Sequence, residues 1–168
     1  MANEALDSIS EENRQLAIRV LERAREHGVT LGCAESCTGG MIAAALTAVP
    51  GSSESFVGGI VSYWVEVKEA VLGVDADIIG EHGVVSVETA MAMASGAREV
   101  LSCDYAVATT GIAGPTGAQP GKPVGTVCYG IATPHGCDGF MRCAGDSRDE
   151  VRAQAVTTAL TALLEALS

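Results

Sequence analysis

A predicted strand passes directly into a predicted helix in the stretch Val29-Thr30-Leu31-Gly32-Cys33-Ala34-Glu35-Ser36-Cys37-Thr38-Gly39-Gly40. Residues 29–34 form a short apolar run that fits a buried strand. Residues 38–49 have the pattern of a helix, which Pro50-Gly51 should end. A strand that leads at once into a helix is the repeating unit of α/β proteins. This stretch therefore indicates an α/β fold.

The same alternation continues outward from this stretch in both directions. Further helices are predicted at about 11–27, 66–72, 75–81, 87–101 and 147–167. Further strands are predicted at 56–64, 105–110, 124–132 and 139–144. Because the last two strands are consecutive and separated only by a turn, at least one strand should be antiparallel. We predict a three-layer α/β/α sandwich with a mixed, mostly parallel sheet of about five strands.

Composition limits the function classes that fit the chain. The 168 residues show no internal repeat or linker and predict one domain over residues 1–168. The net charge of −11 argues against nucleic-acid binding, although a few local donors can still hold one phosphate. No apolar run reaches the ~18 residues of a spanning helix, so we expect no membrane partner. The acidic, polar start over residues 1–13 does not resemble a signal peptide and predicts a cytoplasmic protein.

The six cysteines do not predict a metal site or a disulfide framework. No C-x-x-C pair occurs, and thiols should stay reduced in the expected compartment. Most of these cysteines are interpreted as small core residues. We therefore expect neither a metal nor another cofactor.

Ser36 is a candidate nucleophile because it lies between a strand end and a helix start. Ligands gather at the carboxyl ends of strands in such sheets. Free N–H groups at a helix start also favour a developing oxyanion. Spacing alone favours the alternative that Ser36 or Thr38 is simply the N-cap of the helix, and Cys37 is a rival nucleophile.

Lys68 is the candidate base, since the three histidines are explained by helix ends and a turn. It is one of only two lysines and follows Tyr63 by five residues. A lysine that is partly buried loses pKa through desolvation and can then accept a proton. The alternative interpretation is a surface lysine paired to Glu66 or Glu69.

Two further segments suggest ligand binding. Residues 109–126 follow a strand and are rich in Gly and Pro, so their backbone can approach a ligand closely. Arg148 opens the last helix, where it could bind a phosphate together with the helix N-terminus. The alternative for Arg148 is a solvated ion pair with Asp149 or Glu150.

Taken together, these segments resemble the C-terminal amidohydrolase domain of the CinA competence/damage-inducible proteins. The resemblance extends over residues 11–165. The matching segments are Ala34-Glu35-Ser36-Cys37-Thr38-Gly39-Gly40, Pro50-Gly51-Ser52-Ser53, Gly59-Ile60-Val61-Ser62-Tyr63 with Lys68, Leu72-Gly73-Val74, His82-Gly83-Val84-Val85-Ser86, Thr110-Gly111-Ile112-Ala113-Gly114-Pro115 and Lys122-Pro123-Val124-Gly125-Thr126. Several ordered motifs over that length are more specific than any one alone.

The resemblance implies a deamidase that converts nicotinamide mononucleotide to nicotinate mononucleotide and ammonia in pyridine-nucleotide salvage. It implies a metal-free Ser/Lys/Tyr site, which falls on Ser36, Lys68 and Tyr63, and a chain that self-associates into a homo-oligomer. The expected partner is thus a small pyridine nucleotide. Residues expected to bind it are Thr38, Gly39, Gly40, Thr110, Gly111, Gly114 and Arg148. Larger members carry a further N-terminal domain, whose activities are not carried over.

The chain departs from the family pattern at two places. The family usually has Ser-Asn-Glu-Ala-Lys after the tyrosine, where this chain has Trp64-Val65-Glu66-Val67-Lys68. The family's Gly-Asp-Arg carries an extra Ser147 here. A non-catalytic nucleotide-binding module and a cysteine hydrolase that uses Cys37 therefore remain as alternative functions.

Overall fold

The computed structural model describes residues 9–168, and residues 1–8 of the predicted domain lie outside the described part. Five strands form one sheet in the order β2-β1-β3-β4-β5. They are β1 (Leu31–Glu35), β2 (Phe56–Val61), β3 (Tyr105–Gly111), β4 (Thr126–Thr133) and β5 (Gly136–Cys143). β2, β1 and β3 pair in parallel, whereas β4 pairs antiparallel with both β3 and β5. The predicted mixed sheet is therefore confirmed, with β4 alone running against the other strands.

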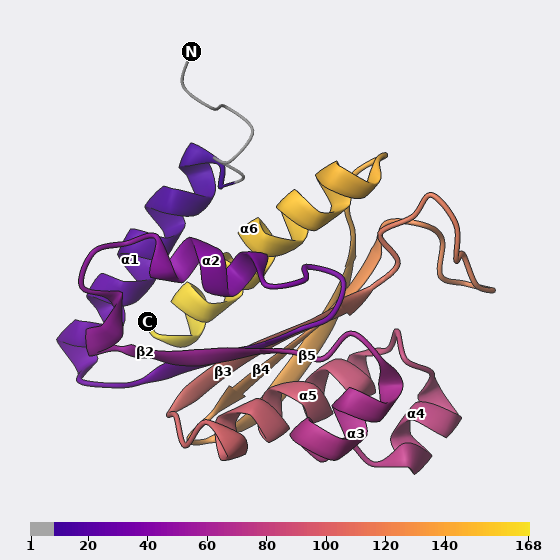
Figure 1. Cartoon of the computed structure of the whole chain (residues 1–168), viewed down its shortest axis with the longest axis horizontal. Helices are drawn as coiled ribbons and strands as arrows, with labels where there is room; N and C mark the ends of the chain where they lie inside the picture. Colours follow the sequence, from indigo (N-terminus) through magenta and orange to yellow (C-terminus); the bar gives the residue numbers. More distant parts are fainter. Residues whose placement is uncertain (1–8) are drawn as a thin grey trace.

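Helices cover both faces of the sheet, which gives the predicted three layers (Figure 1). One face is covered by α1 (Glu11–His27), α2 (Met41–Thr47) and α6 (Arg148–Ala166). The other is covered by α3 (Val65–Leu72), α4 (Ala76–His82) and α5 (Val87–Val100). A 3-10 turn at Ser52–Glu54, η2, precedes β2. The side chains of β1 alternate between these layers, because successive residues of a strand point to opposite faces.

α5 lies close to the sheet because the residues of the sheet that face it are small. Ala34, Ala106 and Ala108 supply that face, and a Cβ on Gly130 would collide with the backbone carbonyl of Ala90 in α5. The sequence therefore lets α5 lie directly on the sheet. α5 also packs closely against the end of α3 at Gly96. A Cβ at this position would collide with the Leu72 carbonyl oxygen, so this approach requires glycine.

Helix ends follow the signals in the sequence. Ser10, Ser86 and Ser147 are N-caps whose hydroxyls accept backbone N–H groups, and Ser147 with Glu150 forms a capping box. Gly28 ends α1 in the left-handed conformation, at a φ of 64°. These caps fix where α6 and α5 begin. Both helix starts lie at the end of the sheet where β1 and β3 finish (Figure 1).

Candidate active site

The candidate site lies at the carboxyl ends of β1 and β3. Ser36 follows the last residue of β1, and only 8% of it is exposed. Its backbone N–H donates to the Thr109 carbonyl oxygen over 3.0 Å, so the serine is anchored to the neighbouring strand. The predicted position of Ser36 at a strand end is confirmed.

The helix after Ser36 begins later than the sequence predicted. α2 starts at Met41 and its N-cap is Gly40, so the predictions of a start at Thr38 and of a Ser36 or Thr38 cap are wrong. Gly39 and Gly40 have φ values of 58° and 100°, which a right-handed helix does not allow. Residues 36–40 therefore form a turn, and the Thr38 hydroxyl lies 2.8 Å from that of Thr109.

The first N–H groups of α2 are already occupied by a buried carboxylate. Glu35 accepts hydrogen bonds from the backbone N–H groups of Gly40, Ile42 and Ala43. The Gly39 N–H donates to the Ser36 carbonyl oxygen. The helix start therefore offers fewer free donors than the sequence suggested. The backbone N–H groups that follow Ser36 directly are those of Cys37 and Thr38, which lie in the turn before the helix. This role of Glu35 was not predicted from the sequence.

Lys68 reaches Ser36 from α3, which covers the face of the sheet opposite to α2. The lysine is fully buried in α3, and its Nζ lies 3.0 Å from Ser36 Oγ. The same Nζ donates to the carbonyl oxygens of Ser62 at 2.5 Å and Tyr63 at 3.3 Å. Among residues 9–168 no carboxylate lies within 4 Å of it, so the alternative of a surface lysine paired to Glu66 or Glu69 is wrong.

Burial makes the Lys68 ammonium group a weak acid that can lose its proton near neutral pH. Desolvation lowers the pKa of its ammonium group from 10.5 to about 8. A neutral lysine has two N–H donors and one lone pair. The two carbonyl oxygens can take the two N–H donors, which leaves the lone pair directed at Ser36 Oγ. The arrangement can therefore remove the serine proton.

Tyr63 and Arg148 meet at the rim of the site. Arg148 Nη2 donates to the Tyr63 hydroxyl at 3.3 Å, and Nη1 donates to the Gly114 carbonyl oxygen at 2.8 Å. The alternative interpretation, an ion pair of Arg148 with Asp149 or Glu150, is not seen in the described residues, and the Glu150 carboxylate caps its own helix instead. Tyr63 contacts Lys68 through its backbone carbonyl. No hydrogen bond of its phenol to Lys68 is found in residues 9–168.

The turn that carries Ser36 is also held from α6. Arg152, one turn after Arg148, donates to the carbonyl oxygens of Cys37 and Thr38 at 3.1 and 3.4 Å. Arg152 was not predicted from the sequence, where its only signal is its place one turn after Arg148 in α6. A Cβ on Gly111 would lie 3.1 Å from Cys37 Sγ, so the turn packs tightly against β3. Thr110 donates its hydroxyl proton to the Val84 carbonyl oxygen.

The structure thus brings together residues from five separate segments, but it gives several of them internal partners. Thr38 and Thr110 are buried and hydrogen-bonded within the protein, and the N–H groups of Gly39 and Gly40 also have hydrogen-bond partners within it. Direct binding of substrate by these four residues stays a prediction. Tyr63, which is 55% exposed, and Arg148 remain accessible to a ligand.

Cys37 is a poor nucleophile in this setting. Its side chain is buried, and desolvation raises the pKa of its thiol to about 11, with the Glu35 carboxylate acting in the same direction. A thiol must lose its proton before it can attack. The local environment therefore favours Ser36 over Cys37.

Two further observations concern ligands and location. Across residues 9–168, no group of three His, Cys, Asp or Glu side chains has a geometry that could hold a metal ion. In the same residues, no helix is long and apolar enough to cross a membrane.

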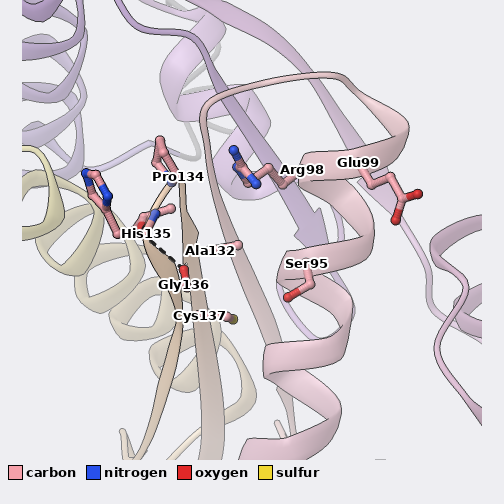
Figure 2. Close-up of a pocket in the computed structure, with 9 residues that line it drawn as sticks. Ser95, Arg98, Glu99, Ala132, Pro134, His135, Gly136 and Cys137 are labelled. Atoms are coloured by element: carbon pink, nitrogen blue, oxygen red, sulfur yellow. Dashed lines mark hydrogen bonds between the residues drawn. The ribbon is translucent and has the colours of Figure 1, made fainter.

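A cavity of about 620 Å³ lies away from Ser36, between α5 and the β4–β5 hairpin (Figure 2). Its lining residues are Ser95, Arg98, Glu99, Ala132, Thr133, Pro134, His135, Gly136 and Cys137. Ala132 pairs with Ala106 at the start of β3, whereas Ser36 lies beyond the end of β1. The cavity is therefore at the opposite end of the sheet and contains none of the predicted site residues.

The fold and site define an α/β/α protein with a buried Ser–Lys pair at the carboxyl end of its first strand. The sequence matches the CinA C-terminal domain over residues 13–167. The chain belongs to the CinA C-terminal domain family. This confirms the resemblance inferred from its motifs.

Individual relatives agree with this assignment. A CinA-like protein of Citrifermentans bemidjiense is 48% identical over 151 residues, which are 90% of this chain and 36% of that protein. One from Geobacter sulfurreducens is 46% identical over 153 residues, which are 90% of this chain and 37% of that protein. The chain thus spans about a third of the length of the curated relatives it matches.

Solved structures match over nearly their whole length. The competence/damage inducible protein CihA from Agrobacterium tumefaciens is 39% identical with a TM-score of 0.89, covering 95% of this chain and 97% of that chain. The competence damage-inducible protein A from Klebsiella pneumoniae subsp. pneumoniae is 35% identical with a TM-score of 0.88, covering 91% and 95%. The arrangement of layers described above is therefore common to these proteins.

Proposed function

We propose that this chain is an amidohydrolase that converts nicotinamide mononucleotide to nicotinate mononucleotide and ammonia. In this proposal Ser36 is the nucleophile and Lys68 is the general base. The observation that carries it is the buried Lys68 Nζ, which lies 3.0 Å from Ser36 Oγ and has no carboxylate partner within residues 9–168. The choice of substrate rests on the motifs that the chain has in common with the CinA family.

The first step forms an ester. Lys68 in its neutral state takes the proton from Ser36 Oγ, which attacks the carboxamide carbon of the substrate. The negative charge that develops on the amide oxygen would be stabilised by the backbone N–H groups of Cys37 and Thr38. The C–N bond then breaks, and the proton held by Lys68 passes to the leaving nitrogen. Ammonia departs and a nicotinoyl ester remains on Ser36.

The second step consumes water. Lys68, neutral again, takes a proton from a water molecule that attacks the ester carbon. The C–O bond to Ser36 breaks and the serine oxygen recovers its proton from Lys68. Nicotinate mononucleotide leaves, and the enzyme returns to its starting state. Direct contact between Lys68 and Ser36 supports a proton transfer that does not pass through the Tyr63 phenol.

Tyr63 and Arg148 fit a role in holding the phosphoribosyl part of the substrate. The Arg148 guanidinium joins Tyr63 to the loop at Gly114. A guanidinium suits a phosphate group because its donors match two oxygens at once. Binding energy from this remote group would favour the nucleotide over free nicotinamide.

The alternative of a non-catalytic binding module rests on the Trp64-Val65 departure. Trp64 is 70% exposed and lies before α3, while Lys68 keeps its contact with Ser36. Because the change to Trp64-Val65 leaves the buried contact between Lys68 and Ser36 intact, we favour a catalytic function over binding alone. The homo-oligomer implied by the family resemblance stays a prediction.

Release of ammonia from nicotinamide mononucleotide by the purified chain tests the proposal. Ser36→Ala should abolish turnover, and Lys68→Met should reduce it by roughly 10²–10⁴-fold, the usual contribution of a general base. Arg142→Met is the matched control, because Arg142 is an exposed cation on β5 beside Phe140. Turnover should also survive a chelator. Full activity in Lys68→Met would refute the proposed base, and no ammonia from the unmodified chain would favour the binding module.

A further inference from the structure

The buried carboxylate of Glu35 takes no part in the mechanism above. Glu35 is the last residue of β1 and is 1% exposed. In the described part of the chain, no Lys, Arg or His nitrogen lies within 4 Å of it. Burying a charged or polar group is costly unless hydrogen bonds compensate it. This position, directly before the proposed nucleophile, therefore calls for an explanation.

The compensation comes from the first turn of α2. Glu35 Oε2 accepts the N–H groups of Gly40 at 3.0 Å and Ile42 at 3.1 Å, and Oε1 accepts that of Ala43 at 2.9 Å. The N-cap of α2 is Gly40, which has no side chain to satisfy these donors. Glu35 does so from five residues upstream, and its charge also suits the helix dipole.

This contact closes the turn of residues 36–40 between two fixed ends. The backbone of Ser36 is tied to Thr109, and the Gly39 N–H donates to the Ser36 carbonyl oxygen. If the Glu35 contacts were lost, the start of α2 could separate from the end of β1. Ser36, which lies between them, would then lose its fixed direction.

The main chain of Glu35 is also connected to the proposed base. Its carbonyl oxygen accepts the Ser62 N–H at 2.8 Å, and the Ser62 carbonyl oxygen accepts from Lys68 Nζ. Ser36 and Lys68 are thus both positioned relative to this one residue. A small rotation at Glu35 would change the 3.0 Å separation of Ser36 Oγ and Lys68 Nζ.

We propose that Glu35 is a positioning residue that holds Ser36 against Lys68 by fixing the start of α2. The proposal rests on the proposed function. Glu35 contacts neither of the two reacting side chains directly through its carboxylate. It acts through the backbone of the turn between them.

The test compares Glu35→Gln with a matched control, Asp104→Asn. Asp104 lies at the opposite end of the sheet and likewise accepts hydrogen bonds, from the Thr30 N–H and hydroxyl. Each substitution replaces a carboxylate oxygen, which accepts hydrogen bonds, with an NH2 group that faces neighbouring donors. In Glu35→Gln we expect kcat to fall on the order of 10²-fold, the cost of displacing a reacting group by about 1 Å. KM should change by less than about threefold, since substrate binding is not altered.

The control separates positioning from stability. Asp104→Asn should lower the melting temperature while kcat and KM stay within about twofold of the wild-type values. If Glu35→Gln does not fold, as judged by circular dichroism, Glu35→Asp replaces it, because its shorter side chain keeps the charge but cannot reach all three N–H groups. Wild-type kcat in the folded variant, or equal losses in the Glu35 and Asp104 variants, would overturn the proposal.

Two readouts that need no substrate distinguish this proposal from the proposed function. The amide protons of Gly40, Ile42 and Ala43 should exchange slowly in the wild type and much faster in Glu35→Gln. Covalent labelling of Ser36 by a fluorophosphonate should slow in parallel. If the unmodified chain releases no ammonia, these two measurements still test whether Glu35 positions Ser36. Unchanged exchange and labelling in Glu35→Gln would refute the role of Glu35.

Discussion

Raising the pH from 7 to 9 should increase kcat/KM for nicotinamide mononucleotide about tenfold, because the proposed base must be neutral to accept a proton. Burial places the pKa of Lys68 at about 8. At a pH one unit below its pKa an amine is about 9% neutral, and at a pH one unit above it the amine is about 91% neutral. An ordinary lysine with a pKa near ~10.4 would be only about 0.04% neutral at pH 7. Burial thus increases the active fraction at pH 7 by roughly 200-fold.

The direction of the pH dependence and the pH range in which it occurs both test Lys68 as the base. Activity rises with pH because deprotonation creates the active form, and it should level off above pH 9. Phosphate monoesters titrate near ~6, below this window. The pKa of the Cys37 thiol is raised to about 11 by burial, above the window. The substrate phosphate and the rival nucleophile therefore cannot produce the same curve.

The assay is ammonia release at low substrate concentration in buffers of constant ionic strength from pH 6 to 11. Arg142→Met is the control and should reproduce the wild-type curve. Lys68→Met should lose the rise along with most of the activity. A flat profile between pH 7 and 9 would refute Lys68 as the base. A midpoint above 10 would refute either its desolvation or its role.

Three further substitutions test separate parts of the site. Tyr63→Phe removes the acceptor of the 3.3 Å hydrogen bond from Arg148, so steady-state kinetics should show KM raised roughly 3- to 10-fold with kcat within about twofold; a loss of kcat as large as that of Lys68→Met would place the phenol in the proton transfer. Cys37→Ala should keep kcat within about threefold in the ammonia assay, because a buried thiol with a raised pKa is not the nucleophile; inactivation of the folded variant would restore the cysteine hydrolase. Trp64→Ser supplies the missing side-chain cap of α3 at an exposed position and should add about 0.5–1 kcal/mol of stability, or roughly 1–4 °C in Tm by calorimetry; an unchanged or lower Tm would show that the tryptophan contributes packing not apparent from its exposure.

Most of the fold could be predicted because its element boundaries are marked by local signals. Gly28 and Ser86 end or begin helices where the sequence placed them, and Ser147 is the N-cap of the last helix, for which the sequence left Asp146 or Ser147 open. Capping could be predicted because it depends on residues within one turn. The start of α2 was predicted wrongly for the same reason. The N-cap Gly40 has no side chain, and the first N–H groups of α2 are satisfied by the Glu35 carboxylate, five positions before Gly40, a spacing that matches no local capping pattern.

The candidate site was predicted in its main residues, but its geometry was not. Ser36 could be placed because a strand end and a helix start mark it. The burial of Lys68 could not be derived from a helix whose neighbouring residues are acidic. One signal was available, since Lys68 and Leu72 are four residues apart and form the buried face of α3. Arg152 was missed because its contacts depend on how α6 lies over the turn of Ser36.

The central claim is that Ser36, activated by Lys68, forms an ester with the nicotinoyl group. Rapid acid quenching of the enzyme during turnover of nicotinamide mononucleotide, followed by peptide mass mapping, tests it most directly. We predict an added mass of the nicotinoyl nucleotide on the peptide that contains Ser36, fragmenting at Ser36 and absent in Ser36→Ala. The same mass on Cys37, or turnover with no covalent adduct at any quench time, would contradict the account.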